Sequence, residues 1–206
     1  MTAAPLVIAC GALATELRAV LKAHGLADAV EVTYLPANLH NRPERIVPEL
    51  EPLLDAASEQ QRPVFVAYAD CGTGGALDAL LLRHPEATRL PGSHCYEFFS
   101  GSEQFAAMHE EEIGTFFLTD FLAKHFEPLL WQGLGLDRHP QLLEMYFGNY
   151  RRVVLISQTE SEAIVEMGRA AAERLGLEFE HRHVGMGPFT KALTEGVAIS
   201  VSRRVA

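Results

Sequence analysis

Residues 63–75 decide the fold, and they read PVFVAYADCGTGG. The first seven are an almost unbroken apolar run rich in β-branched and aromatic side chains, which is typical of a strand in a sheet covered on both faces. The polar and glycine-rich residues that follow predict a tight turn, and residues 74–82 predict the next helix. We therefore expect a buried parallel strand, a turn and a helix.

The same alternation of strand and helix extends in both directions. Further strands are predicted at residues 6–10, 30–35, 88–90, 152–157 and 177–183, and helices at residues 12–24, 43–59, 161–175 and 188–195. This spacing is typical of the α/β class, with a mostly parallel sheet and helices on both faces. Helices are also predicted at residues 102–109, 115–130 and 140–147. We interpret residues 102–150 as a helical insertion or cap on a single domain spanning residues 1–206.

The amino-acid composition indicates which binding partners and which cellular compartment to expect for the protein. The 206 residues carry a formal net charge of −10, which argues against a nucleic-acid partner and against an anionic membrane surface. The chain lacks the run of about 20 apolar residues that a membrane span needs, and its first residues do not resemble a signal peptide. Three cysteines are too few for a disulfide framework. We expect a cytoplasmic protein with reduced thiols, and a homodimer as the usual assembly.

The three cysteines are candidates for one shared site. Cys10 ends the first predicted strand, Cys71 ends the third, and Cys95 lies in a predicted loop at residues 92–101. In the common strand order 2-1-3, the first and third strands are neighbours about 4.8 Å apart, and ligands bind beyond their carboxyl ends. We predict that the three thiolates hold zinc or an iron–sulfur cluster, with one position open for a small-molecule substrate.

Two other interpretations of the cysteines stay open. Free cysteine is often a small buried hydrophobic residue without chemistry. A pair of neighbouring thiols can also form a reversible disulfide. If the site binds metal, His94, Asp70 and Glu97 are candidates for a fourth ligand or for a group that orients the ligands. We assign His94 and Glu97 to catalytic proton transfer if the protein is an enzyme.

The turn after the third strand is a candidate for anion binding. Its glycines allow backbone N–H groups at a helix start to approach a carboxylate or phosphate of the substrate. Neither the Walker A pattern nor the dinucleotide pattern is matched, because no Gly-Lys-Ser/Thr follows and the third glycine of the second pattern is missing. The predicted substrate-binding residues are Gly11, Asp70, Gly72, Thr73, Gly74 and Gly75.

Two further polar features interrupt apolar segments. Asp120 lies inside an apolar stretch, so its carboxylate must be paired or lie at a boundary. His181 and His183 alternate on the last predicted strand and therefore face the same side. The glycine-containing loop at residues 185–188 follows them at the carboxyl edge of the sheet.

Four segments resemble a family known as domain of unknown function 1638: residues 8–13 (IACGAL), 70–75 (DCGTGG), 92–97 (GSHCYE) and 112–121 (EIGTFFLTDF). The resemblance extends over roughly residues 5–185. No established activity of the family carries over to this chain. Its members are often encoded beside corrinoid proteins and their methyltransferases, so the resemblance implies a role in corrinoid-linked methyl transfer or one-carbon metabolism, with such a protein as a partner.

Two hypotheses follow for the function. The first is a metal-binding protein of methyl transfer whose three-cysteine site lies at the carboxyl edge of the sheet. The alternative is a non-catalytic accessory, carrier or sensor module that docks on a methyltransferase. An open coordination position beside a perturbed histidine or carboxylate favours an enzyme, whereas a closed four-ligand site favours a module. The sequence leaves open whether the protein is an enzyme.

Overall fold

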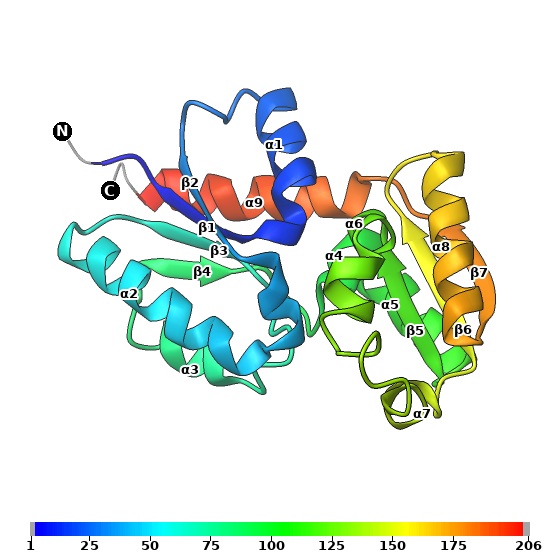
Figure 1. The fold of residues 1–206 in the computed structure, drawn as a ribbon. Coiled ribbons are helices and arrows are strands. Elements are labelled where there is room, and N and C mark those ends of the chain that lie inside the picture. Colours follow the sequence, from blue (N-terminus) through cyan, green and yellow to red (C-terminus); the bar gives the residue numbers. More distant parts are fainter. Residues whose placement is uncertain (1–2, 204–206) are drawn as a thin grey trace. The chain divides into compact units, whose positions relative to one another are not determined.

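The computed structural model describes residues 3–203, and these residues fall into two compact units (Figure 1). Unit 1 lies within residues 1–98 and 188–206, and unit 2 is residues 99–187. Each unit has its own parallel sheet with helices around it, so the predicted α/β class is confirmed. We expected one sheet in one domain, and the structure has two sheets, one in each unit.

Unit 1 contains a parallel sheet in the order β2-β1-β3-β4, so its first three strands have the common order that we assumed when placing Cys10 beside Cys71. Its strands are β1 (Leu6–Cys10), β2 (Glu31–Leu35), β3 (Val64–Ala67) and β4 (Ala87–Arg89). Its helices are α1 (Ala14–Ala23), α2 (Ile46–Glu59), α3 (Ala76–Leu81), α9 (Gly187–Arg203) and α4 (Cys95–Ser100), which begins in unit 1. Three 3-10 segments lie at Gly11–Leu13, Ala37–Asn41 and Pro43–Arg45.

Helices cover both faces of the unit 1 sheet (Figure 1). On one face, Ile8 and Val66 belong to a buried apolar cluster with side chains of α2 and α3. On the other face, α9 lies so close to the sheet that a side chain at Gly196 would overlap the ring of Phe65. This burial on both faces explains why β1 and β3 are almost wholly apolar.

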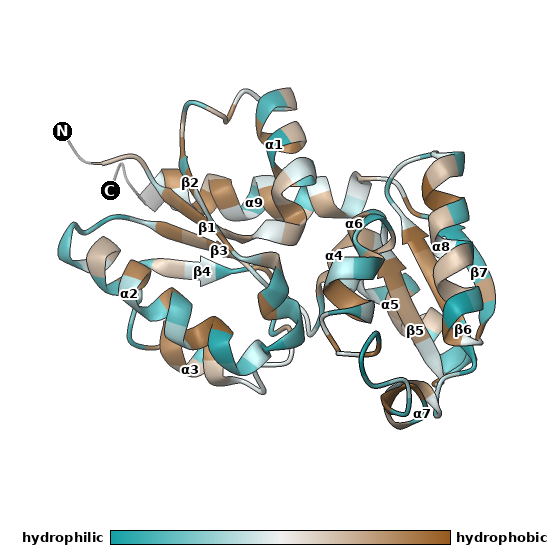
Figure 2. Ribbon diagram, viewed as in Figure 1, coloured by the Kyte–Doolittle hydropathy of each residue, from teal (hydrophilic) through white to brown (hydrophobic). Residues whose placement is uncertain are grey.

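Unit 2 contains a parallel sheet in the order β5-β6-β7. Its strands are β5 (Thr115–Thr119), β6 (Arg152–Ser157) and β7 (Glu178–His183), and its helices are α5 (Ser102–Glu111), α6 (Asp120–Lys124), a π-helix (Phe126–Trp131), α7 (Leu142–Phe147) and α8 (Glu162–Leu175). Gly168 of α8 packs directly on Leu155 and Phe179, so α8 lies close to β6 and β7. Figure 2 shows β5 and β6 as largely apolar, whereas β7 is mostly hydrophilic.

The predicted helix at residues 115–130 is wrong in its first part. Residues Thr115–Thr119 form β5, and each pairs in parallel with a residue of β6, from Thr115 with Arg152 to Thr119 with Ile156. A short apolar run is ambiguous between helix and strand, and pairing with a neighbouring strand decides between them. The predicted helix at residues 188–195 is present within the longer α9. None of the helices formed by residues 3–203 has the length and apolar character that crossing a bilayer requires.

Asp120 is buried and fully paired, as its position in an apolar stretch predicted. Its carboxylate accepts hydrogen bonds from the backbone N–H of Gln158 (3.1 Å), the backbone N–H of Thr159 (3.0 Å) and the Thr159 hydroxyl (2.6 Å). The Asp120 backbone N–H donates to the Gln158 side chain (3.2 Å). These bonds join the carboxyl end of β5, where α6 begins, to the carboxyl end of β6.

We expect Asp120→Ala to lower the free energy of unfolding by about 3 kcal/mol, because the buried N–H of Gln158 and the partly buried N–H and hydroxyl of Thr159 lose their acceptor. Urea unfolding followed by circular dichroism measures this change. Asp137→Ala is the matched control, since Asp137 is exposed, and it should change the stability by less than about 0.5 kcal/mol. Equal effects of the two substitutions would contradict a structural role for the Asp120 network.

Candidate functional site

The three cysteines, which are far apart in the sequence, line one cavity in unit 1. The cavity has a volume of about 30 Å³, which is room for one or two water molecules or a single ion. Besides Cys10, Cys71 and Cys95, it is lined by Ala12, Leu13, His40, Ile46, Ala67, Tyr68 and Phe98. The convergence expected from the strand ends is therefore present in the structure.

Parallel pairing of β1 with β3 brings the first two cysteines to the same edge. Cys10 is the last residue of β1, and the register pairs Ala9 with Ala67 at the end of β3. Cys71 follows β3 by four residues. The chain turns immediately after Cys10, at Gly11. A Cβ atom at this position would lie only 2.9 Å from the backbone oxygen of Leu35, so glycine is needed there.

Two backbone hydrogen bonds hold Cys71 close to the segment that carries Cys95. The Cys71 N–H donates to the Ser93 carbonyl (2.8 Å), and the Asp70 N–H donates to the Gly92 carbonyl (3.1 Å). Cys95 begins α4, which replaces part of the loop that we predicted at residues 92–101. Cys71 has a φ of 50°, in the left-handed region that non-glycine residues rarely adopt. A strained backbone at a cavity-lining cysteine is typical of a functional position.

The three thiols have different pKa values because their surroundings differ. The Cys95 thiol donates a hydrogen bond to the Cys71 sulfur, and this bond lowers the pKa of Cys71 below its usual value. The same hydrogen bond, together with burial, raises the pKa of Cys95 well above its usual value. Burial raises the pKa of Cys10 to about 11. Cys71 is therefore the thiol that most readily becomes a thiolate.

Tyr68 and His40 line the cavity but were not among the predicted site residues. Tyr68 is buried, with an exposed fraction of 3%. Its hydroxyl has no hydrogen-bond partner among the described residues. Burial raises the pKa of Tyr68, and the adjacent Cys10 sulfur adds to this. Burial lowers the pKa of His40, with a further contribution from His94, so the His40 ring favours its neutral form. The sequence held a signal for both residues, because each follows a strand at its carboxyl end.

The two predicted catalytic residues lie near the cavity without lining it. Glu97 accepts a hydrogen bond from the Ser93 backbone N–H (2.9 Å), and its carboxylate occupies the space where a side chain at Gly92 would be. Glu97 thus shapes the loop in front of α4. His94 is exposed, and its ring is 6.4 Å from the ring of Tyr96. The catalytic roles of His94 and Glu97 stay predictions.

The predicted anion-binding turn is occupied by its own carboxylate. Asp70 accepts hydrogen bonds from the Thr73 hydroxyl (2.7 Å) and from the backbone N–H groups of Gly75 (2.8 Å) and Gly74 (3.1 Å). The Thr73 bond and these backbone bonds lower the pKa of Asp70. Gly72, in a left-handed conformation, packs against Pro43. None of these turn residues, nor Gly11, lines the cavity, so their role in substrate binding stays a prediction.

The metal site predicted from the cysteines is not preformed. Within residues 3–203, no group of three or more His, Cys, Asp or Glu side chains is arranged as the ligands of a metal ion. Cys10, Cys71 and Cys95 line a common cavity without forming such a group. The fourth-ligand candidates from the sequence, His94, Asp70 and Glu97, do not line this cavity, whereas His40 does.

We expect iodoacetamide to alkylate Cys71 before Cys10 and Cys95, because only its pKa is lowered. The rate at Cys71 should fall with decreasing pH at a midpoint below that of an ordinary thiol. Cys95→Ala removes the donor and should raise this midpoint, whereas Cys95→Ser keeps a donor and should change it less. Peptide mass spectrometry over a pH series measures the rates, and faster alkylation of Cys10 would contradict the assignment.

Comparison with known proteins places the chain in a family. No curated protein and no solved structure gives a match to this chain. Residues 34–193 match the family model described as a protein of unknown function, DUF1638. The matched range includes Cys71, Cys95 and the whole of unit 2, and most of the chain lies within it. The chain therefore belongs to the DUF1638 family.

Proposed function

We propose that the protein acts through a redox-active thiol pair, in which Cys71 is the attacking thiolate and Cys95 is its partner. The observation that carries this proposal is that both thiols line one small cavity, where hydrogen bonding between them lowers the pKa of Cys71 and raises that of Cys95. A thiolate beside a protonated thiol is the arrangement in which one sulfur attacks and the other resolves the mixed disulfide.

The surroundings support the pairing of these two sulfurs. The bonds from Cys71 N–H to the Ser93 carbonyl and from Asp70 N–H to the Gly92 carbonyl fix the two segments next to each other. The Tyr68 hydroxyl and the neutral His40 ring lie at the same cavity, where they can hydrogen-bond to a sulfur or to an atom attached to it. Because the cavity is too small for a disulfide molecule, the co-reactant must reach Cys71 from the solvent, to which this residue is partly exposed.

The proposed reaction uses a small-molecule disulfide as oxidant. The Cys71 thiolate attacks one sulfur of this disulfide, the sulfur–sulfur bond breaks, and one thiolate leaves. The leaving thiolate takes the proton of Cys95, and the Cys95 sulfur then attacks Cys71 and displaces the second half of the oxidant. Two protein thiols are oxidised to one disulfide, and the small disulfide is reduced to two thiols.

The third sulfur supports a second candidate. A thiol pair has no use for Cys10, yet Cys10 lines the same cavity. Zinc or an iron–sulfur cluster held by Cys10, Cys71 and Cys95 would use all three sulfurs. Metal binding would release the protons of Cys10 and Cys95, so it would strengthen with rising pH. This candidate is the metal-binding function predicted from the cysteines, and its place in corrinoid-linked methyl transfer is what the family resemblance implies.

The process and the partners rest on the family resemblance. For either candidate we propose a place in one-carbon metabolism, with a corrinoid protein or a methyltransferase as partner. The alternative is that the protein has no catalytic step of its own and docks on the methyltransferase as a carrier or sensor. The acidic net charge of −10 supports a protein or small-molecule partner over a nucleic acid or a membrane.

Oxidised glutathione should convert the reduced protein to a form with a disulfide between Cys71 and Cys95. Mass spectrometry of non-reduced peptides identifies the link. Cys10→Ser is the matched control and should form the same disulfide, because Cys10 takes no part in the reaction. Cys95→Ser should stop at a glutathione adduct on Cys71. A disulfide that includes Cys10, or no disulfide in protein whose Cys71 is still alkylated, would overturn the thiol-pair proposal.

Elemental analysis and a visible spectrum of anaerobically purified protein test the metal candidate. The expected result is about one metal site per chain, lost in both Cys71→Ser and Cys10→Ser, because three thiolates hold the ion. The Cys10→Ser variant separates the two candidates, since it keeps the thiol pair and removes the three-cysteine site. Protein that is repeatedly metal-free would exclude the metal candidate.

A further inference from the structure

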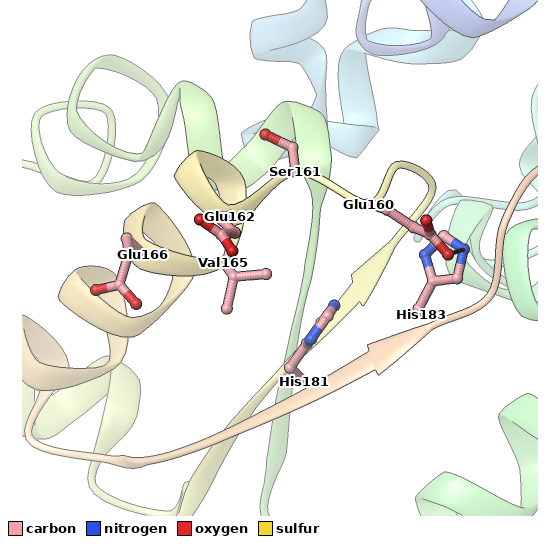
Figure 3. Close-up of a pocket in the computed structure, with 7 residues that line it drawn as sticks. All are labelled: Glu160, Ser161, Glu162, Val165, Glu166, His181 and His183. Carbon is pink, nitrogen blue, oxygen red and sulfur yellow. Dashed lines mark ion pairs between the residues drawn. The ribbon is translucent and has the colours of Figure 1, made fainter.

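A second cavity lies in unit 2, where β6 and β7 end and α8 begins (Figure 3). Its volume is about 590 Å³, and it is lined by Glu160, Ser161, Glu162, Val165, Glu166, His181 and His183. In Figure 3 the His181 ring extends from β7 into the space beside α8, and the Glu160 carboxylate lies next to the His183 ring. The carboxyl edge of a parallel sheet is where α/β proteins bind ligands. This cavity has no part in the thiol function proposed above.

One buried hydroxyl joins the two imidazole rings. Ser157, the last residue of β6, is fully buried, and its Oγ is 2.8 Å from His181 Nε2 and 3.2 Å from His183 Nδ1. A hydroxyl has a single proton to donate. Among the described residues, the buried Oγ of Ser157 has no hydrogen-bond partner besides these two rings, so its proton goes to one of them. When both rings are neutral, Ser157 then accepts the N–H of the other ring. Of the two remaining ring nitrogens, one carries a proton and the other a lone pair.

Glu160 favours one of these two arrangements, because it lies close to the free ring nitrogen of His183. His183 Nε2 is 3.9 Å from the Glu160 Oε1 atom, and a carboxylate attracts an N–H there and repels a lone pair. This interaction favours the tautomer of His183 that carries its proton on Nε2 and accepts the Ser157 proton at Nδ1. Ser157 in turn accepts the N–H of His181 Nε2, which leaves the lone pair on His181 Nδ1.

The charges around the cavity select the ligand. Three glutamates line it, one of which, Glu166, is paired with Arg169 outside the lining (3.5 Å), and none of the described residues that line it is Lys or Arg. At the start of α8, the Ser161 hydroxyl already accepts the Ile164 backbone N–H (3.4 Å). An anionic ligand would be repelled, whereas a cation with N–H donors would be attracted to both the carboxylates and the imidazole lone pair.

We propose that this cavity is a binding site for a small organic cation with a protonated amine, which donates a hydrogen bond to His181 Nδ1. Ser157 acts as a positioning residue, because it fixes the tautomer of His181 without contacting the ligand. Glu160 serves the ligand twice, by balancing its charge and by holding the proton on His183.

Nuclear magnetic resonance of the full chain labelled with ¹⁵N at histidine tests the site, with ethylammonium as the probe and acetate as the comparison. The ¹⁵N shifts should place the proton of neutral His181 on Nε2. Ethylammonium should shift the His181 signals in a saturable way, and acetate should not. A proton on Nδ1 of His181, or an equal response to acetate, would overturn the proposal.

Two variants test separately how the tautomer of His181 and the charge of Glu160 contribute to ligand binding. Ser157→Ala should weaken ethylammonium binding about tenfold and should mix the two His181 tautomers, because a hydrogen bond to a charged group is lost or misdirected. Glu160→Gln should also weaken binding, and Glu110→Gln is its matched control, since Glu110 is exposed and lies outside the cavity. Equal effects of the two Gln variants would show only a response to net charge and would contradict the site.

Discussion

The parallel pairing of β1 with β3 is the constraint on which the cysteine site depends. The four paired positions run from Leu6 with Val64 to Ala9 with Ala67, and all eight residues are buried. Because the two strands run in the same direction, their carboxyl ends meet at one edge of the sheet. Cys10 and the turn that carries Cys71 therefore lie side by side, although 60 residues lie between them in the sequence.

The three thiols in this small cavity differ in pKa because they are buried close to one another. Loss of hydration opposes every thiolate, and a second negative charge nearby would add repulsion. A single thiolate, stabilised by a neighbouring thiol that keeps its proton, is the arrangement that avoids both costs. Cys71 takes this role because Cys95 donates to it, and the backbone bonds to Gly92 and Ser93 keep the donor in place.

Unit 2 repeats this construction with different chemistry. Its parallel strands also bring polar residues from β6 and β7 to one carboxyl edge, where Ser157 is paired in register with His183. The edge strand β7 is only partly buried, so its histidines line an open cavity in place of a closed one. In the proposed site, the buried Ser157 hydroxyl couples the protonation of the two imidazole rings, as hydrogen bonding with Cys95 does for Cys71.

The sequence by itself determined the α/β class, the positions of Cys10 and Cys71 at strand ends, and the need to pair Asp120. These follow from local apolar patterns and from the rule that parallel strands share an edge. Tertiary structure alone decided that Thr115–Thr119 is a strand, because pairing with β6 outweighs a helical pattern. It also decided that Tyr68 and His40, and not His94 or Glu97, line the cavity. Side-chain direction beyond a strand end depends on packing between distant segments, which local sequence does not encode.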